Sequence, residues 1–171
     1  MTARPPMHHF RPGPDSDRAF RDALASFGTG VTIVTIASPE GPVGITANSF
    51  SSVSLDPPLV LWSASLASRR FPLFAQAEKL AIHVLAEDQH ELCWAFSKSR
   101  HAFDSIDWRA RDDGLPLIEG CLARFECSKY AKYDGGDHAI IVSHVEKISF
   151  REGRPLLFFG GNIGRLAGTA Q

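Results

Sequence analysis

Several features that the sequence lacks exclude whole classes of protein. No apolar run approaches the roughly 18 residues that a membrane-spanning helix needs, and the proline-rich first 14 residues contain no apolar segment of a secretory signal. The formal net charge is −1 and the pI is near 6.6, so there is none of the basic excess that nucleic-acid binding requires. We therefore expect a cytoplasmic protein that binds neither nucleic acid nor membranes.

Cysteine is scarce and shows no pattern of its own. The three cysteines are Cys93, Cys121 and Cys127, which form no C-x-x-C pair and cannot all be joined in disulfides. No histidine lies near them at zinc-finger spacing. We expect free, buried thiols and no metal site.

The two standard nucleotide-binding loops are also missing. No G-x-G-x-x-G follows a predicted strand, and no Walker A sequence occurs. Any nucleotide must therefore be bound by a different arrangement of backbone and side chains.

The length of 171 residues favours one domain, over residues 15–171, after a flexible tail of residues 1–14. Phe20, Leu24 and Phe27 recur at helical spacing and predict an amphipathic helix that ends at Gly28. The simplest interpretation of this apolar stripe is packing against the core.

Extended runs dominate the remainder: seven runs have strand character, and the tally is about six strands. The runs with strand character span residues 31–37, 42–50, 58–65, 80–85, 121–133, 138–150 and 155–159. Short helices are expected at 68–77 and after a capping box formed by Asp88 and Glu91. The sequence of residues 98–116 predicts a long polar loop. Loops of that length within a compact domain are often functional. Strands joined by hairpins favour a mainly β protein, with an antiparallel β-barrel into which helices are inserted.

The most informative segment is GITANSFSSVSLDPPLVLW, residues 44–62. It predicts a strand, a polar turn crowded with small hydroxyl and amide side chains, and a second strand. Such side chains allow a ligand to approach backbone N–H groups and can add hydrogen bonds to it. Serine and threonine also favour turns for purely local reasons, so composition alone leaves both interpretations open.

This segment resembles the signature of the short-chain flavin reductases, the reductase components of two-component flavin monooxygenases. Four further segments match the family in order and spacing, and the resemblance covers residues 20–166. They are FRDALASFGTGVTIVT, FPLFAQAEKLAIHVLAEDQHELCWAFS, GGDH at 135–138 and PLLFFGG at 155–161.

The resemblance implies a six-stranded Greek-key split barrel that works as a homodimer. It implies FMN or FAD and NADH or NADPH as ligands, and a possible flavin-dependent oxygenase as partner. The residues at flavin-binding positions are Gly30, Thr46, Ala47, Asn48, Ser49, Ser51, Ser52, Val53, Ser63, Ser65, Ser68 and Arg69, with Phe103 of the long loop as a further candidate.

On the nicotinamide side the resemblance implies His138, Phe159, Gly160 and Gly161. His138 would position the nicotinamide without acting as an obligatory base, although a histidine at a strand end can also be purely structural. Many relatives place arginine or tyrosine in the closing segment, whereas this chain reads GGNIGRL. Asn162 and Arg165 are the candidates to substitute for them, and the choice between NADH and NADPH stays open.

The expected reaction is hydride transfer from nicotinamide C4 to flavin N5, for which the protein supplies orientation and electrostatics. Two alternatives use the same barrel: a pyridoxamine-phosphate-oxidase-like enzyme and a non-catalytic flavin-binding or redox-sensing module. The first would need a basic cradle for the substrate's phosphate, and the only adjacent basic pair near the hydroxyl-rich turn is Arg69-Arg70.

Overall fold

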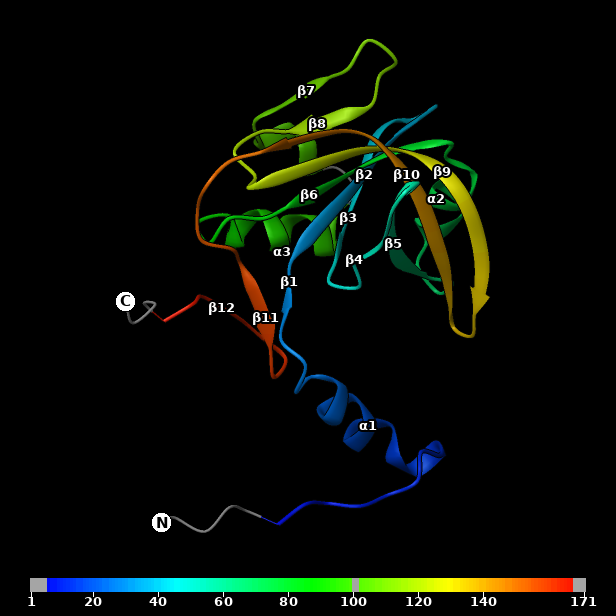
Figure 1. The fold of residues 1–171 in the computed structure, drawn as a ribbon, viewed down its shortest axis with the longest axis vertical. Coiled ribbons are helices and arrows are strands. Elements are labelled where there is room, and N and C mark those ends of the chain that lie inside the picture. The colour runs from blue at the N-terminus through cyan, green and yellow to red at the C-terminus, as the bar shows by residue number, and fades with distance from the viewer. Residues whose placement is uncertain (1–5, 100–101, 168–171) are drawn as a thin grey trace.

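Antiparallel strands make up most of the molecule (Figure 1). The computed structural model describes residues 6–99 and 102–167. The first five residues of the expected tail lie outside the described residues, and residues 6–13 form no helix or strand.

The largest sheet curves into a split barrel in the order β3-β2-β6-β9-β10-β5-β4. Its strands are β2 (Thr32–Ser38), β3 (Gly41–Ala47), β4 (Ser51–Leu55), β5 (Pro58–Ser65), β6 (Lys79–Val84), β9 (Ala123–Gly135) and β10 (His138–Phe150). Every neighbouring pair is antiparallel. The long hairpin of β9 and β10 carries two register shifts, which increase strand bending. The expected antiparallel barrel is confirmed.

Strand β4 is the seventh strand of this sheet, and the sequence prediction missed it. Residues 51–55 were expected to belong to a polar turn, but they pair with β5 at the edge of the sheet. Most residues of β4 are exposed. An edge strand without a buried face lacks the apolar alternation by which strands are recognised in a sequence.

The interior of the barrel is filled by a single apolar cluster. Trp62 of β5 packs edge-on against Phe74 of α2 (Phe71–Gln76), with ring centroids 5.2 Å apart. Cys127 lies fully buried in the same cluster, and burial raises the pKa of its thiol to about 12. Cys93 is also buried, Cys121 is half-buried, and all three thiols are free.

Helix α3 (His90–Lys98) packs against β3 at a glycine. A Cβ at Gly44 would lie 2.4 Å from the ring of Phe96, so the helix approaches as closely as it does because that position has no side chain. Arg70 donates hydrogen bonds to the carbonyl oxygens of Gly44 and Phe96, at 2.9 and 2.5 Å. The expected capping box is wrong, because the helix is preceded by Gln89, whose side chain instead accepts a hydrogen bond from Ala86 N–H.

The long polar segment between α3 and β9 is largely structured within the described residues. It contains a 3₁₀ turn, η2 (Ala102–Ser105), and a small hairpin of β7 (Trp108–Ala110) and β8 (Pro116–Ile118).

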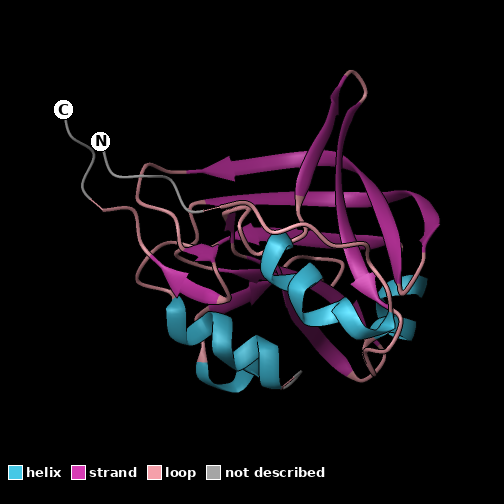
Figure 2. Ribbon diagram, turned by 90° about the horizontal axis from the view of Figure 1, so that it is seen from below, coloured by secondary structure: helices cyan, strands magenta, loops and turns pink. Residues whose placement is uncertain are grey.

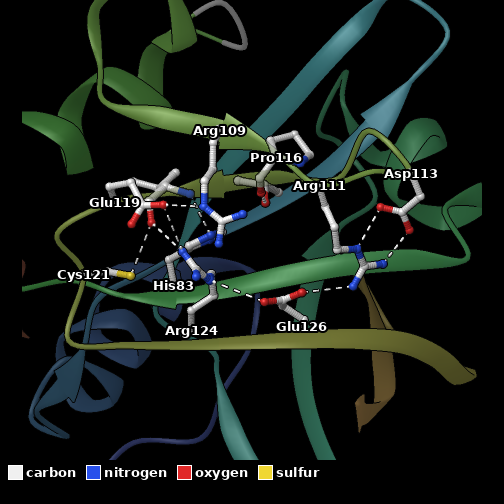
Figure 3. A network of polar contacts seen from close by, with 11 residues as sticks. His83, Arg109, Arg111, Asp113, Pro116, Glu119, Cys121, Arg124 and Glu126 are labelled. Atoms are coloured by element: carbon white, nitrogen blue, oxygen red, sulfur yellow. Dashed lines mark hydrogen bonds and ion pairs between the residues drawn. The ribbon is translucent and has the colours of Figure 1, made fainter. Parts of the chain in front are cut away.

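A layer of charged side chains fastens this hairpin to the outside of the large sheet (Figure 3). Arg111 binds Asp113 beside it and Glu126 of β9, the latter at 3.0 Å. The Arg111 guanidinium holds the pKa of the Asp113 carboxyl well below its usual range. The segment thus serves packing, which the sequence prediction of a functional loop did not foresee.

Helix α1 (Asp17–Leu24), preceded by the 3₁₀ turn η1 (Pro14–Ser16), projects from the barrel (Figure 1). It contains no buried residue, and Phe20, Leu24 and Phe27 are 45%, 59% and 78% exposed. The expected packing of this stripe against the core is therefore wrong, because no element among the described residues covers it. The α-helices all lie outside the curved sheet (Figure 2).

A third, three-stranded sheet joins the two ends of the fold. It consists of β1 (Thr29–Gly30), β11 (Leu157–Phe159) and β12 (Asn162–Gly164), in the order β1-β11-β12. Among the described residues, no helix is long and apolar enough to cross a membrane.

Candidate functional site

Two adjoining hollows open where β3, α3, α1 and the β11–β12 hairpin meet. The central hollow is lined by Val31, Thr46, Ala47, Asn48, Cys93, Trp94, Ser97, Phe158 and Ile163. The helix hollow is lined by Arg21, Asp22, Leu24, Ala25, Phe27, Thr29, Asn48, Ser49, Phe158, Gly160 and Gly161. Asn48 and Phe158 line both hollows, so the two adjoin, and together they are called the groove.

The end of β3 and the turn after it lie at the junction of the two hollows, and two hydroxyls there hold the backbone in place. Thr46 Oγ1 donates a hydrogen bond to the carbonyl oxygen of Cys93 at 2.7 Å. Ser49 Oγ accepts one from Ser63 N–H at 2.9 Å. The exposed side chain of Asn48 and the backbone of the turn are the groups presented to a ligand.

The walls of the central hollow suit a flat heteroaromatic ring. Val31, Ala47, Phe158 and Ile163 make most of the central hollow apolar, with a few polar groups at its margin. In the helix hollow, the buried hydroxyl of Thr29 has no hydrogen-bond partner in the described part of the chain. A buried hydroxyl of this kind is costly unless a ligand or water satisfies it.

His138 is the first residue of β10 and lies opposite Ser65 of β5. Its Nδ1 donates a hydrogen bond to Asp137 Oδ1 at 2.7 Å, and this bond lowers the pKa of the Asp137 carboxyl. The charge of Arg21 contributes to the same shift, and Arg21 also lines the helix hollow. Two sequence-predicted residues, His138 and Ser65, therefore lie opposite each other on β10 and β5, and neither lines the two hollows.

The other predicted residues divide between the groove and the surface around it. Gly160 and Gly161 form the tight turn of the β11–β12 hairpin, with φ of +58° and +77°, and both line the helix hollow. Ser51, Ser52 and Val53 lie exposed on the edge strand β4. The remaining positions outside the two linings are Gly30, Ser63, Ser68, Arg69 and Phe159.

Phe103 was predicted to contact flavin, but it is buried behind α3. Its ring packs edge-on between Phe96 and Trp108, with centroid separations of 4.9 and 5.1 Å. The aromatic side chain thus belongs to the core that carries the small hairpin.

Sequence reasoning missed the wall that α3 contributes. Cys93, Trp94 and Ser97 lie on the face of α3 that lines the central hollow. Cys93 and Ser97, four residues apart, share one face of the helix, and Trp94 lies at the edge of that face. The sequence alone did not distinguish these residues from ordinary helix positions. The contribution of α1 was missed because its stripe was assigned to the core.

Comparison with known proteins places these features in a family. The flavin reductase-like domain matches residues 24–167. The FMN reductase (NADH) SmoA of Agrobacterium fabrum is 53% identical over 163 residues, covering 95% of this chain and 94% of its own. HsaB of Mycobacterium tuberculosis, the reductase subunit of a flavin-dependent monooxygenase, is 38% identical over 149 residues, covering 85% and 80%.

Solved structures of flavin reductases are also similar to this chain. The NADH:FAD oxidoreductase SgcE6 of Streptomyces globisporus has a TM-score of 0.89 at 35% identity, covering 99% of this chain and 97% of its own. The same enzyme in complex with NAD and FAD fragments has a TM-score of 0.86, covering 95% and 100%. The match extends over almost the whole barrel, and this chain belongs to the flavin reductase-like domain family.

Proposed function

We propose that this chain reduces free flavin, FMN or FAD, at the expense of NADH. The observation that carries the proposal is the groove itself, in which the apolar walls of the central hollow meet the end of β3 and the polar turn after it. NADH is the nucleotide named for SmoA and SgcE6, and FMN and FAD are their respective flavins.

The chemistry of the reaction belongs to the two bound ligands, since the flavin accepts at N5 the hydride that leaves nicotinamide C4, and solvent supplies the accompanying proton. The residues of the groove bind the flavin and the nicotinamide and orient the two rings. Val31, Ala47 and Phe158 exclude water from the ring faces, and the backbone dipoles of the turn after β3 favour negative charge on a ring. Thr46 and Ser49 hold that turn by bonds to Cys93 and Ser63.

The protein is further proposed to act as a homodimer in the cytoplasm and to pass reduced flavin to an oxygenase component. The exposed apolar stripe of α1 supports the dimer, because such a surface is normally covered. The oxygenase is supported by relatives such as HsaB, described as a monooxygenase reductase subunit. Three free cysteines suit a reducing compartment.

The test is oxidation of NADH by the purified chain with FMN, FAD, riboflavin or no flavin added. We expect oxidation that requires added flavin. Flavin binding without NADH oxidation would instead indicate a binding module, and oxidation without flavin would contradict the proposal.

A further inference from the structure

Arg70 connects three elements beside the central hollow. It directly precedes α2, and its N–H donates a hydrogen bond to Ser68 Oγ at 3.2 Å. Its half-buried side chain donates to the carbonyl oxygens of Gly44, Phe96 and Ser97, at 2.9, 2.5 and 3.3 Å. One guanidinium therefore bonds the backbone of β3 and of α3, which are distant from Arg70 and from each other in the sequence.

The bonds to α3 are made at the C-terminal end of the helix. Phe96 and Ser97 belong to the last turn, where the final carbonyl oxygens have no partner within a helix. A positive charge at this end is favoured by the helix dipole. The donors of arginine form a planar fork, so one side chain can bond several carbonyl oxygens at once. Arg70 thus fixes the end of α3 relative to β3.

Both of the bonded elements form walls of the central hollow. Thr46 and Ala47 line it from β3, two and three residues after Gly44, and Ser97 lines it from α3. Arg70 is not among the lining residues, so it bonds the walls without entering the hollow.

The basic pair Arg69-Arg70 is divided between the surface and the interior. Arg69 is exposed, whereas Arg70 is half-buried and bonded to the carbonyl oxygens of β3 and α3. The pair therefore does not present two adjacent guanidinium groups to a phosphate, and the role of Arg70 lies within the fold.

We propose that Arg70 is a positioning residue for the ring bound in the central hollow. It holds the end of α3 at a fixed distance from β3 and thereby sets the width of the hollow. The inference rests on the proposed function, because that function places a flat ring between these walls. A change of about one ångström in their spacing is enough to weaken the contacts with a rigid ring.

Titration of the flavin-free protein with FMN tests the proposal, at a temperature where circular dichroism shows each variant to be folded. Arg70→Ala should raise the Kd for FMN at least about tenfold. Arg70→Lys keeps the charge but loses the planar fork, so it should raise the Kd by a smaller factor, about threefold. A Kd equal to that of the parent in either variant would overturn the proposal, and Arg70→Lys carries the test if Arg70→Ala does not fold.

Two comparisons separate positioning from a general loss of stability. Arg109→Ala removes an arginine that is bonded to Glu119 on the small hairpin, outside the groove, and should bind FMN as the parent does. Guanidinium ion at millimolar concentration, compared with sodium chloride at the same concentration, should lower the Kd of Arg70→Ala alone, because the ion can bond the carbonyl oxygens that the side chain has left. A rise in the Kd of Arg109→Ala as large as that of Arg70→Ala would overturn the proposal.

Failure of the proposed function would be recognised separately. A parent protein that binds FMN but does not oxidise NADH contradicts the reductase function, while the comparison of Kd values still tests the role of Arg70. A parent that oxidises NADH with added FMN, together with unchanged Kd values in both Arg70 variants, contradicts the role of Arg70 alone.

Discussion

At the scale of single residues, His138 has the most specific predicted role. It begins β10 opposite Ser65, and Asp137 orients its ring through a hydrogen bond from Nδ1. The ring is about half exposed and therefore accessible to a ligand. That His138 positions the nicotinamide stays a prediction, and the residue is not among those that line the central hollow.

We therefore expect His138→Ala to raise the KM for NADH by about tenfold or more, with the Kd for flavin nearly unchanged. Steady-state kinetics and flavin titration measure the two quantities separately. Asp137→Asn, which keeps the imidazole but weakens its orientation, should give a smaller rise. Equal loss of flavin and NADH binding in His138→Ala would remove the role assigned to it.

His83 is a buried histidine with a structural role. Nδ1–H donates to the Ile33 carbonyl oxygen at 3.0 Å, and Nε2 accepts from Ile118 N–H at 3.1 Å, which fixes a neutral tautomer between two strands and the small hairpin (Figure 3). Burial, more than the neighbouring Arg124 charge, lowers its pKa from 6.5 to about 3. The folded state thus resists protonation of a group that the unfolded chain protonates readily.

Between pH 6.5 and about 3 the unfolded state binds the extra proton, so stability must fall as the pH falls through this window. We expect the His83 contribution to the free energy of unfolding to decrease by about 1.4 kcal/mol per pH unit there. Urea denaturation between pH 6.5 and 4.5 measures this before most carboxylates titrate. His83→Gln, whose amide can still donate and accept, should lower stability overall but flatten the slope. An equally steep slope in His83→Gln would assign the pH dependence to other groups.

At the scale of elements, the docking of α3 on β3 determines the shape of the central hollow. Three contacts hold it: the close approach at Gly44, the bonds from Arg70 and the bond from Thr46 to Cys93. The face of α3 that lines the central hollow is therefore positioned from β3.

Gly44→Ala should displace α3, because its Cβ would lie 2.4 Å from the Phe96 ring. We expect a loss of about 1–3 kcal/mol in stability together with weaker flavin binding, measured by denaturation and titration. Gly164→Ala is the matched control, since nothing lies within 4 Å of its added Cβ. The double variant Gly44→Ala/Phe96→Leu should recover part of both losses; no recovery would mean that the clash is not the cause.

The sequence predicted some elements closely and missed others for identifiable reasons. Strands β5 and β10 match their predicted bounds, because alternation and β-branched residues mark half-buried strands. Strand β4 was missed because its residues are exposed on both faces. The small hairpin was hidden because charged side chains, which resemble solvated loop residues in a sequence, fasten it to the sheet.

Four of the residues predicted to bind flavin, Thr46, Ala47, Asn48 and Ser49, line the groove, and that they bind flavin there stays a prediction. The use of two of these hydroxyls to hold the backbone depends on contacts with Cys93 and Ser63, which are distant in sequence. For the same reason no local pattern could show that Phe103 lies in the core.

At the scale of the whole molecule, α1 is the element whose apolar stripe stays uncovered in a single copy of the described chain. Its stripe is exposed although its apolar residues also form part of the helix hollow. A second copy that covers this stripe would at the same time enclose the groove, and the proposed dimer therefore bears on ligand binding as well as on stability.

We expect the protein to elute as a dimer in size-exclusion chromatography with light scattering. Phe20→Asp/Leu24→Asp should shift it to the monomer, because burying two carboxylates in an apolar interface is strongly unfavourable. Circular dichroism should show the β-fold retained. Arg18→Ala on the same helix is the control and should remain a dimer; a dimer that survives both aspartates would place the interface elsewhere.

Anaerobic mixing of the protein and FMN with NADH carrying deuterium at one or the other C4 position tests the central claim most directly. If the groove holds the two rings for direct hydride transfer, the flavin absorbance is lost on mixing, and deuterium at only one of the two C4 positions slows that loss. Bound flavin that stays oxidised, or reduction that is equally fast whichever position carries deuterium and also when both do, would contradict the account.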